Sequence, residues 1–150
     1  MEKIKRVLIA TDGSEPNKSA VEQGLHFAKL LGAKVTALFV MDQIPLQNVP
    51  ADSTVVYTVH ALLENEGKRA VNEVRDAGKQ LGVEVETMVA EGSPAKRIVD
   101  IAADFDLVVI GTVGRSGLSK LLMGSVAEKV ARFAPCPVLI IRARKGAAQQ

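Results

Sequence analysis

The stretch from Asp106 to Ala134, DLVVIGTVGRSGLSKLLMGSVAEKVARFA, decides the fold. Its apolar run at 107–110 predicts a buried strand, because continuous apolar residues are typical of strands covered on both faces. The run stops at Gly111, further glycines follow at 114, 117 and 124, and Ser125 then begins an amphipathic helix. A strand, a glycine-rich loop and a helix N-terminus form an arrangement with which proteins hold phosphate. The stretch therefore predicts an α/β fold with a phosphate-binding loop.

Length and composition indicate an ordinary globular chain. With 150 residues, 47% of them apolar and 24% charged, we expect a single domain over residues 1–150, frayed from about residue 143. A formal net charge of +2 is too small to indicate a nucleic-acid partner or an anionic membrane surface. We therefore expect neither nucleic acid nor membrane as a partner.

The cellular compartment is predicted from cysteine usage and from the start of the chain. The single cysteine, Cys136, has no partner for an internal disulfide, which fits a reducing compartment, and we interpret it as a buried or half-buried small hydrophobe. Glu2 and Lys3 lead directly into a short strand, without the apolar segment of a secretory signal. No apolar run approaches the ~20 residues that span a bilayer. The sequence predicts a soluble cytoplasmic protein.

Strands and helices alternate along the chain. The apolar run at 7–10 predicts a first strand, followed by the polar turn TDGS and a helix that Gly32 ends. A second strand is expected at 35–40, and a long second helix from after Asp52 to Leu81, ended by Gly82. Residues 83–89 alternate apolar with charged residues, which predicts a third strand at an edge of the sheet.

The remaining elements complete a doubly wound sheet. Ser93 and Pro94 predict the start of a third helix, and residues 137–141 a fifth strand. Five strands separated by four helices indicate a parallel sheet with helices on both faces. Right-handed crossovers and burial of the first strand on both edges predict the strand order 3-2-1-4-5. Ligands of such sheets bind where the order reverses, which brings the turn after the first strand beside the loop at Gly111.

The polar residues of this crevice have two interpretations each. Asp12 fits a contact to a sugar hydroxyl or to a metal ion, or it is simply a turn residue. Ser125 fits a hydrogen bond to a phosphate oxygen, or it caps the helix in the box pattern Ser125-Val-Ala-Glu128. Arg115 and Lys120 are in reach of phosphate, or they are solvated loop residues. The residue types alone leave these alternatives open.

Common catalytic and cofactor motifs are absent from the sequence. It contains no G-x-x-x-x-G-K-[ST], and no G-x-G-x-x-G follows the first strand. His26 and His60 fall in predicted helices away from the crevice loops, and neither pairs with a nucleophile or forms a metal site with Cys136. These absences favour binding over fast catalysis.

Three motifs together carry a family resemblance that extends from Ile4 to Arg142. The glycine loop has the spacing G-x2-G-x9-G-[ST], from Gly111 to Ser125, the chain begins with VLIATDGSEPNKSA, and PCPVLIIR stands near its end. In these features the chain resembles the universal stress protein family, in particular its ATP-binding branch.

The resemblance implies a role for each matching position. Asp12 and its two predecessors would lie against ribose and adenine, the backbone of Val40 would contact adenine, and the glycine loop would surround the phosphates. The implied ATP-binding residues are Ala10, Thr11, Asp12, Val40, Gly111, Thr112, Gly114, Arg115, Gly124, Ser125 and Val126. Magnesium or manganese would accompany ATP or another adenine nucleotide, with Asp12 a candidate near the metal. The family also dimerises by pairing its last strands, here Val138, Leu139, Ile140 and Ile141.

Three functions are then in competition. The first is an ATP-binding regulatory dimer of the stress response, acting on a protein partner that the sequence does not identify. The second is a slow ATPase or phosphotransferase using the same site, because phosphoryl transfer depends on positioning and metal more than on a covalent group. The third is a nucleotide-free dimerisation module whose glycines only shape a loop. The intact glycine loop and the lack of a dedicated base favour the first, so we expect at most weak ATP hydrolysis and no catalytic residue.

Overall fold

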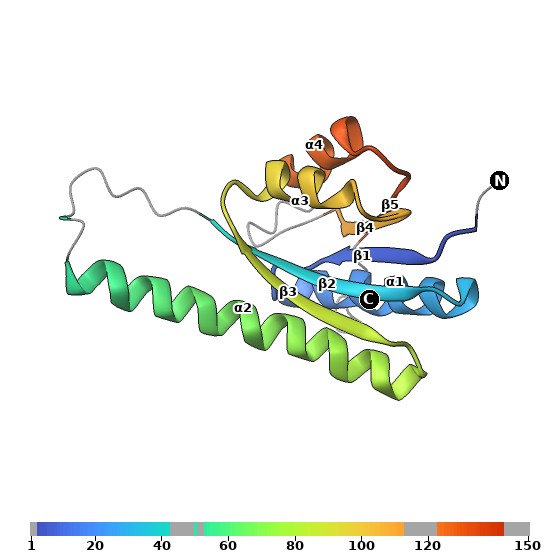
Figure 1. Cartoon of the computed structure of the whole chain (residues 1–150), viewed down its shortest axis with the longest axis horizontal. Helices are drawn as coiled ribbons and strands as arrows, with labels where there is room; N and C mark the ends of the chain where they lie inside the picture. The colour runs from blue at the N-terminus through green and yellow to red at the C-terminus, as the bar shows by residue number, and fades with distance from the viewer. Residues whose placement is uncertain (1–2, 43–49, 51–52, 113–122, 143–150) are drawn as a thin grey trace, which may run out of the picture.

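The chain folds into one parallel five-stranded sheet between two layers of helices. The computed structural model describes residues 3–42, 50, 53–112 and 123–142. Within them the elements are β1 (Arg6–Ala10), α1 (Glu15–Leu31), β2 (Lys34–Met41), α2 (Thr54–Leu81), β3 (Val85–Glu91), α3 (Pro94–Ala102), β4 (Leu107–Gly111), α4 (Ser125–Phe133) and β5 (Val138–Ile141). The strand order is β3-β2-β1-β4-β5 (Figure 1). The predicted fold class and strand order are confirmed.

β1 lies at the centre of the sheet and is buried on every side. It pairs in parallel with β2 on one edge and with β4 on the other, where Leu8 lies opposite Thr36 and Val108. The exposed fractions of Val7, Leu8 and Ile9 are 0%, 0% and 1%. Burial of an apolar side chain of this size contributes about 1.5–3 kcal/mol, so this short strand supplies a large part of the core.

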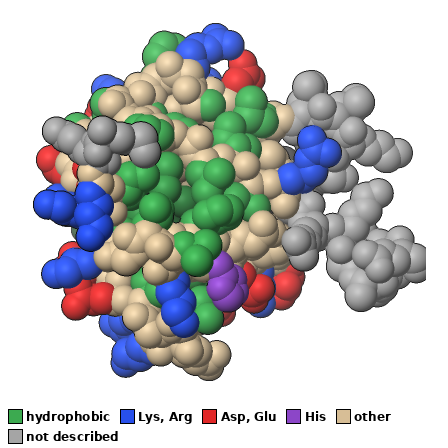
Figure 2. All heavy atoms as spheres, turned by 90° about the vertical axis from the view of Figure 1, so that its right-hand side faces the viewer, with side chains coloured by type: hydrophobic (Ala, Val, Ile, Leu, Met, Phe, Trp, Pro, Cys, Tyr) green, Lys and Arg blue, Asp and Glu red, His purple; other side chains and the backbone are tan. Residues whose placement is uncertain are grey.

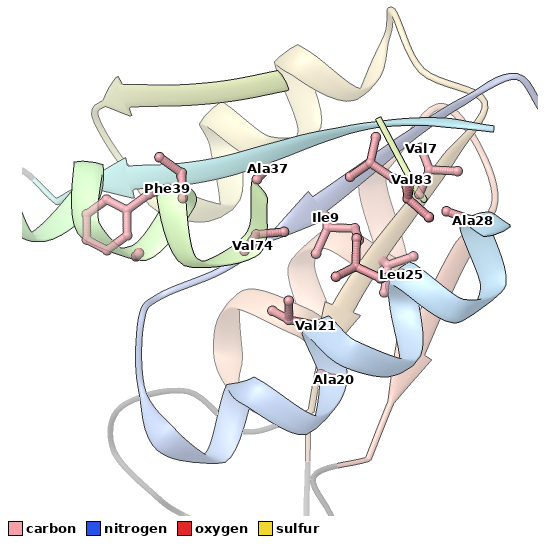
Figure 3. Packing of buried hydrophobic residues seen from close by; sticks show 14 of the residues in the cluster. Val7, Ile9, Ala20, Val21, Leu25, Ala28, Ala37, Phe39, Val74 and Val83 are labelled. Carbon is pink, nitrogen blue, oxygen red and sulfur yellow. The ribbon is translucent and has the colours of Figure 1, made fainter. Parts of the chain in front are cut away.

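Alternation along the strands divides the core between the two faces of the sheet. Val7 and Ile9 point into the cluster under α1 and α2, whereas Leu8 and Ala10 point into the cluster under α3 and α4. Figure 3 shows the first cluster, with Val21 and Leu25 of α1 directed towards Ile9. Both faces of the central strands are therefore covered, as their continuous apolar sequences require.

The amino ends of β2 and β3 follow tight helix-ending turns. Gly32 and Gly82 adopt left-handed backbone angles, with φ of 65° and 76°, that residues with a Cβ rarely adopt. After each glycine the next N–H returns to the helix, from Ala33 to the Ala28 carbonyl and from Val83 to the Gly78 carbonyl. Figure 2 shows this end of the molecule, where apolar side chains gather at the centre within a rim of charged ones. These short turns contrast with the longer connections that follow β2 and β4 at their carboxyl ends.

The third strand begins later than the sequence predicts. β3 spans Val85–Glu91 rather than residues 83–89. Val83 is buried, but its N–H donates to the Gly78 carbonyl, so at this residue the backbone still belongs to the turn that ends α2. The predicted edge position of β3 is confirmed by its pairing with β2 alone and by its exposed residues Glu86, Thr87 and Met88.

α2 is much longer than the strands it covers. It contains 28 residues, and its first turns leave Val55, Tyr57 and Leu62 largely exposed. Its start agrees with the prediction, and Ser53 caps it by accepting a hydrogen bond from the Val55 N–H. Among the helices that the structure describes, none has a stretch long and apolar enough to cross a membrane.

Asp106 ties the start of β4 to the start of β1. Its Oδ2 accepts hydrogen bonds from the backbone N–H groups of Lys5 and Arg6, each at 2.9 Å, and its own N–H donates to the Arg6 carbonyl. The bond from the Lys5 N–H, and then that from Arg6, lowers the pKa of the Asp106 carboxyl below its ordinary value of 3.8. The ionised carboxylate thus favours the folded state.

Replacing Asp106 should change stability in a pH-dependent manner. Because the folded-state pKa is depressed, the contribution is complete above the ordinary value and is lost as the pH falls through the folded-state pKa. We expect Asp106→Ala to lower the thermal midpoint by a few degrees at pH 7, and the difference from wild type to shrink below about pH 4. Asp104→Ala, which removes a nearby exposed carboxylate, is the control. A difference that is constant from neutral to acid pH would contradict the role of Asp106.

Candidate functional site

A cavity of about 390 Å³ lies at the carboxyl ends of β1, β2 and β4. Sheet order places the loops after β1 and β4 side by side at this point, since the chain reverses its direction of winding between these strands. Nine predicted site residues line the cavity, namely Ala10, Thr11, Asp12, Val40, Gly111, Thr112, Gly124, Ser125 and Val126. The other two, Gly114 and Arg115, lie outside the described residues. The structure thus brings together residues that are up to 116 positions apart, from Ala10 to Val126.

The turn after β1 is held by its own side chains. Thr11 Oγ1 accepts a hydrogen bond from the Gly13 N–H at 3.1 Å. Asp12 Oδ1 accepts from the Ser14 N–H at 2.9 Å and from the Ser14 hydroxyl at 2.6 Å. Asp12 therefore stabilises the turn that starts α1, which is the structural role that the sequence left open for it. Its predicted contact with a sugar or a metal remains a prediction.

Val40 lines the cavity, and its N–H and C=O have no backbone partner on the β1 side among the described residues, because β1 ends before β2 does. The last hydrogen bond between β2 and the chain that continues from β1 joins the Thr11 N–H to the Leu38 carbonyl at 2.9 Å. Alternation along the strand turns the N–H and C=O of Val40 to the same side as those of Leu38. β1 has already ended there, and no backbone partner of Val40 on that side is found among the described residues. A donor and an acceptor of the main chain thus stand at the edge of the cavity.

α4 begins at the cavity, and its cap differs from the predicted one. The N-cap is Gly124, with extended backbone angles of −59° and 158°, and its carbonyl accepts from the Glu128 N–H. Ser125 is already the first helical residue, so it cannot cap its own helix, and the capping-box interpretation of Ser125 is wrong. The backbone N–H groups of Ser125, Val126 and Ala127 have no partner within the described part of the chain. Unpaired N–H groups at a helix N-terminus favour an anion.

The two ends of the glycine loop are joined by a hydrogen bond. The Gly124 N–H donates to the Thr112 carbonyl at 2.6 Å, and the Thr112 N–H donates to the Ile141 carbonyl of β5. These contacts fix the start of α4 relative to the end of β4. The start of α4 is therefore held against the ends of β4 and β5.

Apolar side chains from several elements also line the cavity, and their place there was not predicted from the sequence. They come from β2, α2, α3 and β4, with Leu38, Leu63, Pro94, Ile98 and Ile110 among the lining residues. In a sequence these residues are indistinguishable from core residues of the same helices and strands. Only the placement of α3 above the sheet shows that Pro94 and Ile98 border a cavity.

Asn17 is a further residue that the sequence analysis missed. Its exposed fraction is 5%, and it lines the cavity from α1. A signal was present, because Asn17 occupies the helical face that continues through Ala20, Val21 and Gly24 into the core. A polar residue on an apolar helix face is the pattern that could have identified it.

Gly111 makes room for Asn17. A Cβ on Gly111 would lie 2.6 Å from Asn17 Oδ1 and 3.2 Å from the Ala20 Cβ. The first of these distances is far shorter than any van der Waals contact. Packing against Asn17 therefore requires a glycine at residue 111, in addition to the predicted place of this glycine beside a ligand.

The charged side chains of the described cavity wall are both acidic. Asp12 and Asp42 line it, and no lysine, arginine or histidine does so among the described residues. No group of three or more potential metal ligands occurs in the described parts of the chain. An anionic ligand would thus depend on main-chain N–H groups, on a cation that it brings along, or on residues beyond the described wall.

Cys136 lies elsewhere, and burial raises the pKa of its thiol, which fits the predicted role as a small hydrophobe.

Fold and cavity together define a doubly wound α/β protein with a ligand site at its topological switch point, and known proteins share this design. The model of the universal stress protein family matches residues 3–142. Universal stress protein MJ0531 of Methanocaldococcus jannaschii is 38% identical over 143 residues, covering 94% of this chain and 84% of that protein. The chain therefore belongs to the universal stress protein family.

Solved structures show the same architecture. The protein MJ0577 superposes with a TM-score of 0.82 at 26% identity, covering 97% of this chain and all of that one. A universal stress protein solved in complex with cAMP superposes with a TM-score of 0.73 at 25% identity, covering 95% of this chain and all of that one. The fold predicted from the sequence is thus also that of the family.

The contact between Gly111 and Asn17 can be tested by paired substitutions. We expect Gly111→Ala to destabilise the protein by about 1–3 kcal/mol, because the added methyl group overpacks a filled site. Asn17→Ala in the same chain should recover most of that loss, since it vacates the space that the methyl group needs. Denaturant unfolding of the two single variants and the double variant measures the coupling. Additive effects would show that the two residues do not share this space.

Proposed function

We propose that this chain is a regulatory protein of the stress response that binds an adenine nucleotide, with ATP the expected ligand. The observation that carries the proposal is the two-ended cavity. It has an apolar slot beside an unpaired peptide at one end and unpaired helix N–H groups at the other. A nucleotide has the same division between a flat apolar base and an anionic phosphate tail.

The proposed place of adenine is the apolar end. The edge of adenine offers an amino donor next to a ring-nitrogen acceptor, which complements the C=O and N–H of the Val40 peptide. The apolar side chains of Leu38, Leu63 and Ile98 would cover the faces of the ring. The Val40 contact was implied by the family resemblance, and the short β1 supplies a physical reason for it.

The proposed place of the phosphates is the start of α4. The N–H groups of residues 125–127 and the positive end of the helix dipole favour negative charge there, by roughly 0.3–1 kcal/mol for each exposed charge interaction. Gly124 leaves the approach to these groups without a side chain. Arg115 and a magnesium or manganese ion beside Asp12 complete the proposal. The two carboxylates of the described wall make such a cation useful, because they would otherwise repel phosphate.

Support also comes from a relative. The universal stress protein whose structure holds cAMP has the same fold and is 25% identical to this chain. An adenine nucleotide in that protein favours the same class of ligand here. We propose a regulatory role rather than a catalytic one because the sequence offers no dedicated base beside this site. We place this role in the cytoplasm, where nucleotide occupancy would be read by a protein partner.

Nucleotide binding should be visible as a thermal shift. ATP with magnesium at 100 times its dissociation constant should add about 2.7 kcal/mol to the free energy of unfolding. Gly124→Val should abolish this shift by placing a side chain across the phosphate path, while its backbone angles remain accessible to valine. Ser93→Val at the equally extended N-cap of α3 is the matched control and should retain the shift. If millimolar ATP does not shift the thermal midpoint of the wild type, the proposal is overturned. If Gly124→Val shows the same ATP-induced shift as the wild type, the phosphates do not bind at the start of α4.

We further propose that the protein is a homodimer paired through β5. β5 is an edge strand with the uninterrupted apolar sequence VLII, whereas the other edge, β3, carries Glu86 and Glu91. A bare apolar edge promotes aggregation unless another chain covers it. Pairing of Val138, Leu139, Ile140 and Ile141 with the same strand of a second copy would provide that cover.

The dimer can be broken without disturbing the internal sheet. Pro137 and Ile141 direct their carbonyls to β4, so alternation turns the N–H of Ile140 outwards. Ile140→Pro should therefore remove an intermolecular hydrogen bond and yield a folded monomer in sedimentation experiments. Thr87→Pro, at the corresponding outward position of β3, is the control and should leave a dimer. A wild type that sediments as a monomer at micromolar concentration would refute the pairing.

A further inference from the structure

Asn17 is a buried polar side chain for which the described residues supply no side-chain hydrogen bond. Its exposed fraction is 5%, and its carboxamide makes no hydrogen bond with any described residue, although its backbone N–H donates to the Ser14 carbonyl. A buried amide that lacks a partner destabilises a protein by about 1–3 kcal/mol. Such a group is retained either for a structural contact or for a contact with a molecule that enters the cavity.

The surroundings of Asn17 favour a contact with a ligand. The side chain lies on the floor of the cavity, between the ends of β1 and β4, where Oδ1 occupies the space that a side chain at residue 111 would fill. The other residue close to that space is Ala20, whose apolar Cβ lies 3.2 Å from the position of a Cβ at residue 111. Oxygen acceptors for the amide are therefore expected from the open side of the cavity.

Position along the cavity indicates which part of a ligand would meet Asn17. The apolar slot formed by Leu38, Leu63 and Ile98 is at the β2 and α3 side, whereas Asn17 borders Gly111 at the end of β4. The start of α4, with its unpaired N–H groups, follows the glycine loop from the same strand. Asn17 thus stands between the proposed base end and the proposed phosphate end.

We propose that Asn17 is a ligand-binding residue whose carboxamide donates a hydrogen bond to an oxygen of the sugar–phosphate part of the bound nucleotide. The inference rests on the proposed function and adds to it a contact from α1. It explains why the core face of α1 carries a polar residue at this position and why residue 111 has no side chain. A bound nucleotide would supply a hydrogen-bond partner that the described residues do not.

Two substitutions separate this role from a structural one. Asn17→Ala removes the amide, and Asn17→Asp keeps its size but replaces the donor with a charged oxygen. We expect Asn17→Ala to weaken ATP binding about three- to tenfold in calorimetric titration, the effect of one hydrogen bond. The thermal midpoint of the ligand-free variant should stay the same or rise, because an unpaired amide is lost and alanine is the better helix former. Thr36→Val, which removes a buried hydroxyl outside the cavity, should change neither affinity nor the ATP-induced shift.

Adenosine and AMP identify the oxygen that accepts the bond. A loss of affinity of Asn17→Ala that is equal for adenosine, AMP and ATP assigns the contact to the sugar. A loss confined to AMP and ATP, and larger for Asn17→Asp through charge repulsion, assigns it to the first phosphate. Unchanged affinity together with a lower midpoint of the ligand-free variant would overturn the inference and make Asn17 structural, while nucleotide binding by the wild type would still stand. A wild type that binds none of the three probes would overturn the inference and the proposed function together.

Discussion

β1 must be hydrogen-bonded on both edges and covered on both faces, and the rest of the structure depends on this requirement. Its residues Val7, Leu8 and Ile9 have essentially no exposed surface, so β2 and β4 have to flank it and helices have to lie above and below. The chain can meet that demand only by winding outwards in one direction and then returning to the other side of β1. The cavity lies where the direction of winding reverses, and it is therefore a consequence of burying β1.

Unequal strand lengths turn this crevice into a site with distinct ends. β1 ends at Ala10 while β2 continues to Met41, so the N–H and C=O of Val40 have no backbone partner on the β1 side among the described residues. At the other end, α4 starts at Ser125 with a glycine as its cap, which leaves main-chain donors open. Backbone groups therefore supply much of the polar character of the described wall. The position of such main-chain groups depends on the residues at which strands and helices begin and end. Packing of the core determines these residues.

Sequence periodicity predicted the order and type of all described elements because each depends on local pattern. Apolar runs mark β1 and β4, and Gly32 and Gly82 mark the ends of two helices. The misplaced start of β3 has a different cause, because Val83 fits a strand pattern but its N–H is taken by the turn of the preceding helix. The cap of α4 was misassigned since Ser125 and Gly124 are adjacent and only backbone angles distinguish the first helical residue.

The candidate site was predictable where it rests on motif and topology, and not where it rests on packing between distant elements. The loops of Thr11 and Gly111 were expected side by side, and both line the cavity. Leu63, Pro94 and Ile98 were missed because apolar residues at helical spacing carry no sign of facing a void. Asn17 was missed although it is a polar residue on a helix face that is otherwise formed by small and apolar residues.

The close approach of α1 to β4 also determines how this protein can change. Asn17 and Gly111 occupy one volume, so the effect of a substitution at either position depends on the residue at the other. A larger residue at 111 costs less stability after the side chain at 17 has been shortened, so the order in which the two mutations occur matters. The two positions are therefore coupled by steric exclusion, without any contact to a third residue being required.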